Sequence, residues 1–291
     1  MSIRHILLTL LVVAIWGFNF VVIKITVEAM PPYLAAALRF SLAAIPAIFF
    51  IKPPINQNGK TPWLLVIGFA LSFGFALYAL LNFALFAGMP AGLGSLVLQV
   101  QAFFTMIIAF FILRERPKKV QILGAIIAFF GIAIIGYYRW ESAGLWPFIL
   151  TIMAAIAWAI ANIITKIARE INPVALAVWG SAIAAIPLFA LSFAIEGFGE
   201  LVKFIVEPNI LIILMLVLAA YPATLFGLAI WNYLLGKYPT STVAPFTLLV
   251  PITGLIFGWL LLGETIAPYE VIGGVLVIIG LAVGIIKLKK T

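Results

Sequence analysis

Ten long apolar segments follow one another along this chain, separated by short stretches that carry most of its charge. A helix needs about 20 apolar residues to cross the hydrocarbon core of a bilayer, and each segment is close to that length. Strands of a membrane β-barrel would alternate in polarity, whereas residues 122–135 are apolar on every face. The sequence therefore predicts an all-α integral membrane protein with ten transmembrane helices. These predicted helices are residues 6–27, 33–51, 62–87, 91–113, 120–137, 145–167, 174–195, 209–235, 241–262 and 268–286.

The amino-acid inventory excludes most classes of enzyme. The chain has no Cys and no Asp, and its one His, His5, lies at the edge of the first apolar segment. Thiolate metal sites, Cys nucleophiles and His general bases in the core are therefore excluded. An intramembrane enzyme would have to work with Glu and Ser alone, and no such pair is suitably spaced. We expect neither an enzyme nor a bound cofactor or metal. The net charge of +8 indicates membrane orientation rather than nucleic-acid binding.

The basic residues fall unevenly on the two sets of alternate segment ends. One set has only Lys24, Arg139 and Lys203. Because cytoplasmic loops are enriched in Lys and Arg, both termini are predicted to lie in the cytoplasm, with residues 196–207 outside. The first segment continues past Trp16 without a cleavage site, which favours a retained helix over a signal peptide. The other set holds Arg4, Lys52, Lys60, Arg114, Arg116, Lys118, Lys119, Lys166, Arg169, Lys237, Lys287, Lys289 and Lys290.

The second half of the chain repeats features of the first in two independent registers. Because each half holds five predicted helices, an odd number, the second must enter the membrane from the opposite side. We therefore predict two inverted repeats, residues 1–140 and 141–291, around a central cavity, an arrangement typical of transporters. The matches with identical spacing pair Trp16 and Lys24 with Trp158 and Lys166, and Glu115, Gly124 and Gly131 with Glu264, Gly273 and Gly280.

Two tryptophans are candidates for the cavity wall. Trp16 and Trp158 lie near the middle of their segments, about 15 Å from either end, which is too deep for the aromatic belt at the membrane surface. Asn162 follows Trp158 by four residues and shares its helical face. The functional interpretation is a pair of symmetry-related cavity walls. In the alternative, each tryptophan fills space and donates its indole N–H to a neighbouring helix.

Several amides lie in the hydrocarbon zone, where lipid offers no hydrogen-bond partner. Gln99 and Gln101 point about 200° apart, so at most one of them faces a cavity squarely. Some of these amides could instead join helices together. We add Tyr78 and Tyr221, in the third and eighth segments, to the predicted substrate-binding residues. The complete set is Trp16, Asn19, Tyr78, Asn82, Gln99, Gln101, Trp158, Asn162 and Tyr221.

Arg39 lies inside the second segment, where an arginine is costly enough to indicate function. Glu264 ends the ninth segment on the same predicted side. We expect these two side chains to form a structural ion pair or gate, because a permanent pair removes the cost of a bare charge. The alternative is that Arg39 binds the carboxylate of a zwitterionic substrate.

Four stretches resemble the EamA family of the drug/metabolite transporter superfamily. They are LVVAIWGFNFVVIK from Leu11, MPPYLAAALRF from Met30, GMPAGLGSLVLQVQAFFT from Gly88 and APFTLLVPITGL from Ala244. Within that family they are similar to bacterial exporters of cysteine and O-acetylserine. The resemblance covers the whole chain, and it implies ten helices around a cavity lined by the first, third, fourth, sixth, eighth and ninth.

The resemblance also implies a function. It points to a secondary transporter of the bacterial inner membrane that exports small amino acids or related metabolites, cysteine and O-acetylserine first among them, by alternating access. Its partners would be a small-molecule substrate and the lipid bilayer, with no nucleic acid, and the chain would work as a monomer. Export of other amino acids or drug-like metabolites, a channel and a lipid flippase are the alternatives. Because no central carboxylate is present to relay protons, uniport and exchange stand beside proton antiport.

Overall fold

The structure is a computed structural model that describes residues 1–114, 117, 119–141, 144–168, 171–237, 246–247 and 249–285. All regular secondary structure in these ranges is helical, which confirms the predicted all-α fold. Seven helical segments in these ranges are long and apolar enough to cross a membrane. They are Ile3–Ala29, Pro32–Phe49, Trp63–Phe86, Ala91–Ile112, Lys119–Tyr138, Leu145–Ile167 and Pro173–Ile195.

The rest of the second half contributes less regular segments. Phe198–Val206 and Ile210–Phe226 make an eighth span if the pair, bent by 109°, is counted as one. Within the described residues, Leu249–Leu262 and Pro268–Val283 are apolar but shorter than a full span. The chain is therefore a multi-pass helical protein, and the count of ten transmembrane helices stays a prediction.

The first two helices differ from each other in length and in how closely they match the predicted segments. Helix α1 (Ile3–Ala29) is continuous and begins after Ser2, whose side chain accepts a hydrogen bond from the backbone of His5. Helix α2 (Pro32–Ala44) is shorter than the predicted 33–51 and is followed by a 3₁₀ turn, η1 (Ala47–Phe49). The difference arises at Pro46, because proline has no N–H to donate and disfavours helical geometry in the residue before it.

Three further predicted helices, the third, fourth and eighth, also contain a change of helical geometry. The predicted third and eighth segments each enclose eight residues of π-helix, a wider coil that recurs at functional sites. In the third segment α3 (Trp63–Phe69) leads through the π-helix η2 (Ala70–Leu77) to α4 (Tyr78–Phe86). In the eighth, α11 (Ile210–Leu218) leads through η4 (Ala219–Phe226) to α12 (Gly227–Lys237). In the fourth, α5 (Ala91–Val97) and α6 (Gln101–Ile112) flank the 3₁₀ turn η3 (Leu98–Val100).

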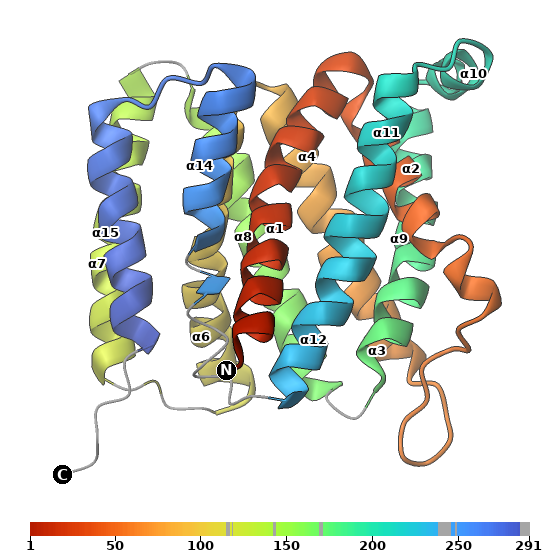
Figure 1. Ribbon diagram of the computed structural model, residues 1–291, viewed down its shortest axis with the longest axis horizontal. Helices are drawn as coiled ribbons and strands as arrows, with labels where there is room; N and C mark the ends of the chain where they lie inside the picture. Colours follow the sequence, from red (N-terminus) through yellow and green to blue (C-terminus); the bar gives the residue numbers. More distant parts are fainter. Residues whose placement is uncertain are drawn as a thin grey trace.

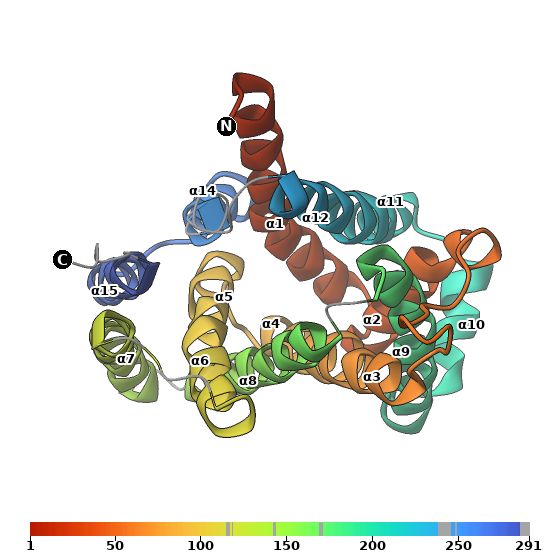
Figure 2. The same cartoon turned by 90° about the horizontal axis from the view of Figure 1, so that it is seen from below.

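The remaining helices are α7 (Lys119–Glu141), α8 (Leu145–Ile167), α9 (Pro173–Ile195), α10 (Phe198–Val206), α14 (Leu249–Leu262) and α15 (Pro268–Ile285). Helix α10 was predicted as loop; it lies across the end of the bundle, on the side opposite the N-terminus (Figure 1). Seen from below, α7 and α15 form a pair at one end of the bundle, and α2, α3 and α9 gather at the other (Figure 2).

Helices α7 and α15 pack through glycines. A Cβ atom on Gly131 would lie 2.4 Å from the carbonyl oxygen of Gly273, and one on Gly280 would lie 2.4 Å from that of Gly124. The order of contacts along α15 is the reverse of that along α7, so the two helices run antiparallel. Close backbone approach is possible only without side chains here, as is typical of membrane helices that pack through small residues.

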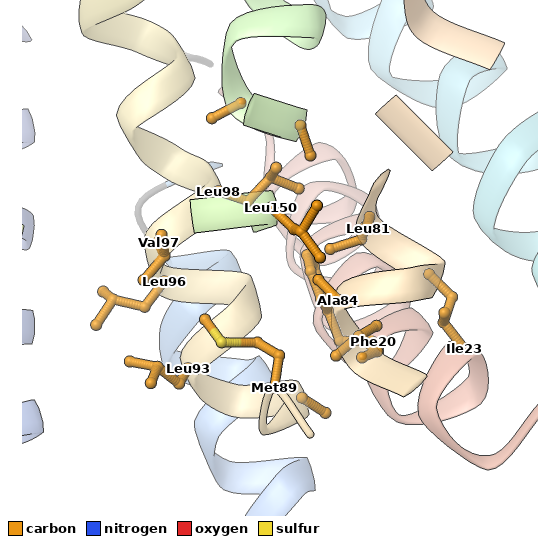
Figure 3. Close-up of a cluster of buried hydrophobic side chains, with 14 of the residues drawn as sticks. Phe20, Ile23, Leu81, Ala84, Met89, Leu93, Leu96, Val97, Leu98 and Leu150 are labelled. Atoms are coloured by element: carbon orange, nitrogen blue, oxygen red, sulfur yellow. The ribbon is translucent and has the colours of Figure 1, made fainter. Parts of the chain in front are cut away.

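Apolar side chains fill the space between α1, α4, α5 and α8 (Figure 3). Nearly all of them are fully buried, and none offers a polar atom to a solute other than through its backbone. The buried polar side chains lie on several helices, among them Arg39 on α2, Asn82 on α4 and Thr224 on η4. The apolar residues labelled in Figure 3 are Phe20, Ile23, Leu81, Ala84, Met89, Leu93, Leu96, Val97, Leu98 and Leu150.

Candidate functional site

The guanidinium group of Arg39 is buried between three helical segments, and the residue is only 3% exposed. Arg39 follows the first residue of α2 by seven positions, which places it about 10 Å along the helix. One of its terminal nitrogens, Nη2, donates to the hydroxyl of Tyr78 on α4 at 3.1 Å and to Oγ1 of Thr224 on η4 at 3.0 Å. The group also stacks over the Tyr78 ring, with Cζ 4.3 Å from the ring centroid.

The positive charge of Arg39 has no counter-ion among the residues that the structure describes. Its partners Tyr78 and Thr224 are neutral, and its other two nitrogens, Nε and Nη1, are buried without any hydrogen bond. A buried, uncompensated charge is costly, and unpaired N–H groups add to that cost. The arrangement is suited to an anionic group that enters the site and takes up the free donors.

The predicted ion pair between Arg39 and Glu264 is wrong. Glu264 instead accepts hydrogen bonds from the backbone N–H groups of Ala91 and Gly92, at the start of α5. Helix α5 begins after Pro90, which has no side-chain acceptor for these N–H groups. A carboxylate at the positive end of a helix dipole is favourable. Glu264 therefore joins α14 to α5, and Arg39 is left free of it.

Glu196 has the same role at another helix and was not singled out in the sequence. Its two oxygens accept the backbone N–H groups of Tyr33 (2.7 Å) and Leu34 (2.9 Å) at the start of α2. This helix also begins after a proline, Pro31, without a side-chain cap of its own. Neither helix is preceded by Ser, Thr, Asp or Asn, the residues that usually cap a helix N-terminus. That absence is the sequence signal that an acid from another part of the chain would bind these N–H groups.

Aromatic rings extend from Arg39 toward α8. The Tyr78 ring meets Phe40 edge-on at 5.0 Å and Phe73 at 5.7 Å, and Phe73 meets Trp158 at 6.3 Å between centroids. A narrow crevice adjoins these groups between α2, η2, α9 and η4, and in this structure it has no room for a water-sized sphere. It is lined by Phe40, Phe69, Phe73, Gly74, Ala177, Gly180, Ser181, Thr224 and Leu228. The two π-helices thus contribute Phe73 and Thr224 to one region.

The two predicted wall tryptophans have different surroundings. Trp16 donates its indole N–H to the carbonyl of Ala223 at 2.9 Å and packs on Trp231, with centroids 5.2 Å apart. A Cβ on Gly227 would lie 2.5 Å from that indole nitrogen, so the tryptophan fills a space that the glycine leaves open. Trp16 therefore matches the packing alternative. The indole N–H of Trp158 makes no hydrogen bond within the described ranges and remains available to a solute.

The amides also divide into two groups. Asn162 donates to Gln101 Oε1 at 2.6 Å and to Thr105 Oγ1 at 3.1 Å, so these side chains join α6 to α8. Gln99 lies on the other face of the same segment. It is 6% exposed, and its amide makes no hydrogen bond with any residue that the structure describes. Of the two glutamines, Gln99 is therefore the one free to contact a solute.

Asn19, Asn82 and Tyr221 complete the predicted set. Asn82 donates to the carbonyl of Pro32, and its Oδ1 is buried without a partner, as is Oδ1 of Asn19. Tyr221 donates to the carbonyl of Ile45 at 2.9 Å, where α2 has ended. Its hydroxyl thus supports the break after α2 and is set apart from Arg39. Thr224, which sequence reasoning missed, lies three residues further along the same π-helix.

Comparison with known proteins identifies a matching family and several similar proteins. The family model described as EamA-like transporter family matches residues 3–137 and 145–285. A protein of Salmonella typhimurium named probable amino-acid metabolite efflux pump is 40% identical over 96% of this chain and 93% of its own. One of the same name from Escherichia coli is 40% identical, covering 99% and 97%. An uncharacterized transporter of Archaeoglobus fulgidus is 27% identical, covering 95% and 97%.

A solved structure has a similar fold. It is 17% identical in sequence, with a TM-score of 0.63 over 98% of both chains. The family match extends over both halves of the chain, and the 40% identity extends over nearly its full length. The chain therefore belongs to the EamA-like transporter family.

Proposed function

We propose that this protein is a secondary transporter that exports small amino acids or related metabolites across the bacterial inner membrane by alternating access. The names of the two relatives at 40% identity support this class of substrate, and the resemblance of the sequence favours cysteine and O-acetylserine. The observation that carries the proposal is the buried guanidinium of Arg39, which has two unpartnered nitrogens and no counter-ion in the described ranges. A substrate carboxylate is the natural anion for it.

In the proposed site the carboxylate contacts both Arg39 and Tyr78. The Tyr78 hydroxyl accepts a hydrogen bond from Arg39, which leaves its own hydrogen free to donate to the substrate. Thr224 donates to the carbonyl of Ala219 and accepts from Arg39, so it holds the guanidinium in place. Trp158 and Gln99 offer free N–H groups for the remainder of the solute. Few polar groups on apolar walls allow a small solute both to bind and to leave.

The proposed architecture is two inverted five-helix repeats with ten transmembrane helices. The family match to residues 3–137 and 145–285 supports two copies of one unit. The π-helices η2 and η4 occupy corresponding places in the two halves. The antiparallel contact of α7 with α15 joins equivalent glycines crosswise, as an inverted repeat requires.

We expect both termini in the cytoplasm and the α10 segment outside, because basic residues are concentrated on the first side. Single cysteines at Lys60 and Gly199 test this in a chain that has none. Both positions are exposed, and a Cβ on Gly199 meets no atom within 4 Å. A membrane-impermeant maleimide should label Gly199→Cys but not Lys60→Cys in intact cells. The opposite pattern would reverse the orientation.

Trp158→Ala and Gln99→Ala should each lower the transport rate by about tenfold or more while the protein stays folded, because both side chains offer free N–H groups to the solute. Trp16→Phe is the matched control. It should lower stability by about 1 kcal/mol through loss of the bond to Ala223, with little effect on transport. The measurements are uptake into proteoliposomes and melting temperature in detergent. Normal transport by both Ala variants would place the site elsewhere.

The experiment that tests the proposed function is uptake of labelled cysteine, O-acetylserine, threonine and phenylalanine into proteoliposomes, with and without a pH gradient. We expect saturable uptake of at least one of these amino acids. Acceleration by the gradient would indicate proton antiport, and independence of it would indicate uniport or exchange. Absence of uptake for all four compounds would contradict the proposal.

A further inference from the structure

We infer that the site around Arg39 recognises the carboxylate of its substrate but provides, among the described residues, no anionic partner for an ammonium group, so that it binds amino-acid derivatives with a blocked or missing amine more tightly than the free amino acids. This inference rests on the proposed function and specifies its substrate class. It follows from where the acidic residues of the chain lie and from the groups that face Arg39.

The acids that the structure describes lie at the ends of its helices. There is no Asp, and the chain has nine Glu residues in all. Glu196 and Glu264 bind the N-termini of α2 and α5. Glu28 pairs with Lys24 at 3.2 Å and is half exposed. Glu270 accepts the backbone N–H of Ala267 at the start of α15.

The remaining acids follow the same pattern along the chain. Glu200 and Glu207 belong to the α10 segment, at the end of the bundle. Glu141 is the last residue of α7, and the structure does not describe its side chain. Positions 115 and 170 lie outside the described ranges and follow the ends of α6 and α8. No glutamate of the described chain therefore faces the interior region that holds Arg39.

The side chains that contact Arg39 are neutral. The hydroxyls of Thr224 and Ser181 donate to the carbonyls of Ala219 and Ala177. Their oxygens can accept a hydrogen bond from an amide N–H as readily as from an ammonium, so they do not compensate a full charge. Arg39 already covers one face of the Tyr78 ring, the kind of surface that could attract a cation.

An ammonium on the same carbon as the carboxylate would be held close to the guanidinium. In an α-amino acid bound through its carboxylate, the two cations are about 6 Å apart, where burial strengthens their repulsion. The ammonium would also lose its hydration without gaining an anion. Acylation of the amine removes the charge and leaves the carboxylate intact. Such a ligand neutralises Arg39, whereas a zwitterion leaves the site with a net positive charge.

Binding of three cysteine analogues to the purified, full-length protein tests the inference. N-acetylcysteine lacks the ammonium charge, 3-mercaptopropionate lacks the amine altogether and adds no bulk, and cysteine methyl ester lacks the carboxylate. We expect 3-mercaptopropionate and N-acetylcysteine to bind about tenfold or more tightly than cysteine, and the ester to show no binding. Thermal stabilisation in detergent measures these affinities without requiring transport.

Variants identify the group that is responsible. Arg39→Gln weakens binding of both ligands. In the weak binding that remains at high ligand concentration, the preference for 3-mercaptopropionate over cysteine should disappear, because the positive charge that repels the ammonium is gone. In Trp158→Ala the preference should persist. Cysteine binding as tightly as 3-mercaptopropionate in the unmodified protein would overturn the inference, as would a selective loss of cysteine affinity in Trp158→Ala, which would place the ammonium on that ring.

Failure of the inference differs from failure of the proposed function. If cysteine is transported and binds more tightly than its amine-free analogue, the exporter proposal stands and the selectivity is contradicted. If no amino acid is transported while 3-mercaptopropionate binds more tightly than cysteine in an Arg39-dependent manner, the selectivity stands and the amino-acid export proposal is contradicted.

Discussion

Replacing Arg39 by glutamine should weaken binding and transport of carboxylate substrates by about thirtyfold or more without unfolding the protein. Removing one partner of a buried, hydrogen-bonded charge pair costs about 2 to 5 kcal/mol in binding, which corresponds to roughly a thirtyfold to several-thousandfold loss of affinity. The empty protein loses only two hydrogen bonds to neutral groups, with Tyr78 and Thr224, and is relieved of an uncompensated charge. Its melting temperature should therefore stay within a few degrees of the original or rise.

Arg39→Lys is the matched control, since it keeps the charge but not the planar arrangement of donors. It should retain weak binding, between that of the original protein and that of Arg39→Gln. Substrate affinity and melting temperature measured on all three proteins separate binding from stability. Normal transport by Arg39→Gln would show that the guanidinium is not part of the substrate site.

Glu264→Ala should be among the most destabilising single changes in the chain. It leaves the N–H groups of Ala91 and Gly92 without an acceptor at the start of α5, and each unsatisfied buried donor costs about 1 to 3 kcal/mol. The expected loss is about 2 to 5 kcal/mol in the free energy of unfolding. Glu264→Gln keeps one acceptor oxygen and should lose less. Melting temperature in detergent provides the ranking.

Glu207→Ala, at an exposed acid after α10, is the control and should change stability by less than about 0.5 kcal/mol. The double variant Arg39→Gln with Glu264→Ala distinguishes the helix cap from an ion pair. Because the two side chains have separate partners, their effects on stability should add. Recovery of stability in the double variant would instead indicate that Arg39 and Glu264 interact directly.

The helices could be predicted from the sequence because their apolar residues form uninterrupted runs, and α8 begins and ends where it was expected, at Leu145 and Ile167. The changes of geometry inside the runs could not. Pro222 gives a local reason for irregularity in η4, but η2 contains no proline and depends on its packing against α8 and α9. Helix α10 was missed because nine residues between two spans resemble a loop in length and charge.

The candidate site was predictable in part. An arginine inside an apolar segment marks Arg39 without any structure, but its partners depend on the rotation of α2 against α4 and η4. The partners of Glu264 are backbone N–H groups, which no residue type reveals. Trp16 and Trp158 are equivalent in the sequence, and they differ because Gly227 leaves a space beside Trp16.

The two glutamines show the same limit of prediction from sequence. The sequence indicated that Gln99 and Gln101 point in opposite directions without showing which direction is inward. The choice depends on Asn162, which binds Gln101 from α8 and leaves Gln99 free of hydrogen bonds in the described chain. Contacts between segments far apart in the sequence therefore decide which of the predicted residues can meet a solute.

The most direct test of an alternating-access exporter is counterflow in proteoliposomes. Vesicles that contain the protein are loaded with a high concentration of unlabelled cysteine and diluted into a trace of labelled cysteine. A carrier that exposes one site alternately to each side exchanges the two, so the label should accumulate transiently above its equilibrium level, and this overshoot should be absent with Arg39→Gln. Label that rises only to equilibrium, without saturation and equally with Arg39→Gln, would contradict the account and indicate a channel.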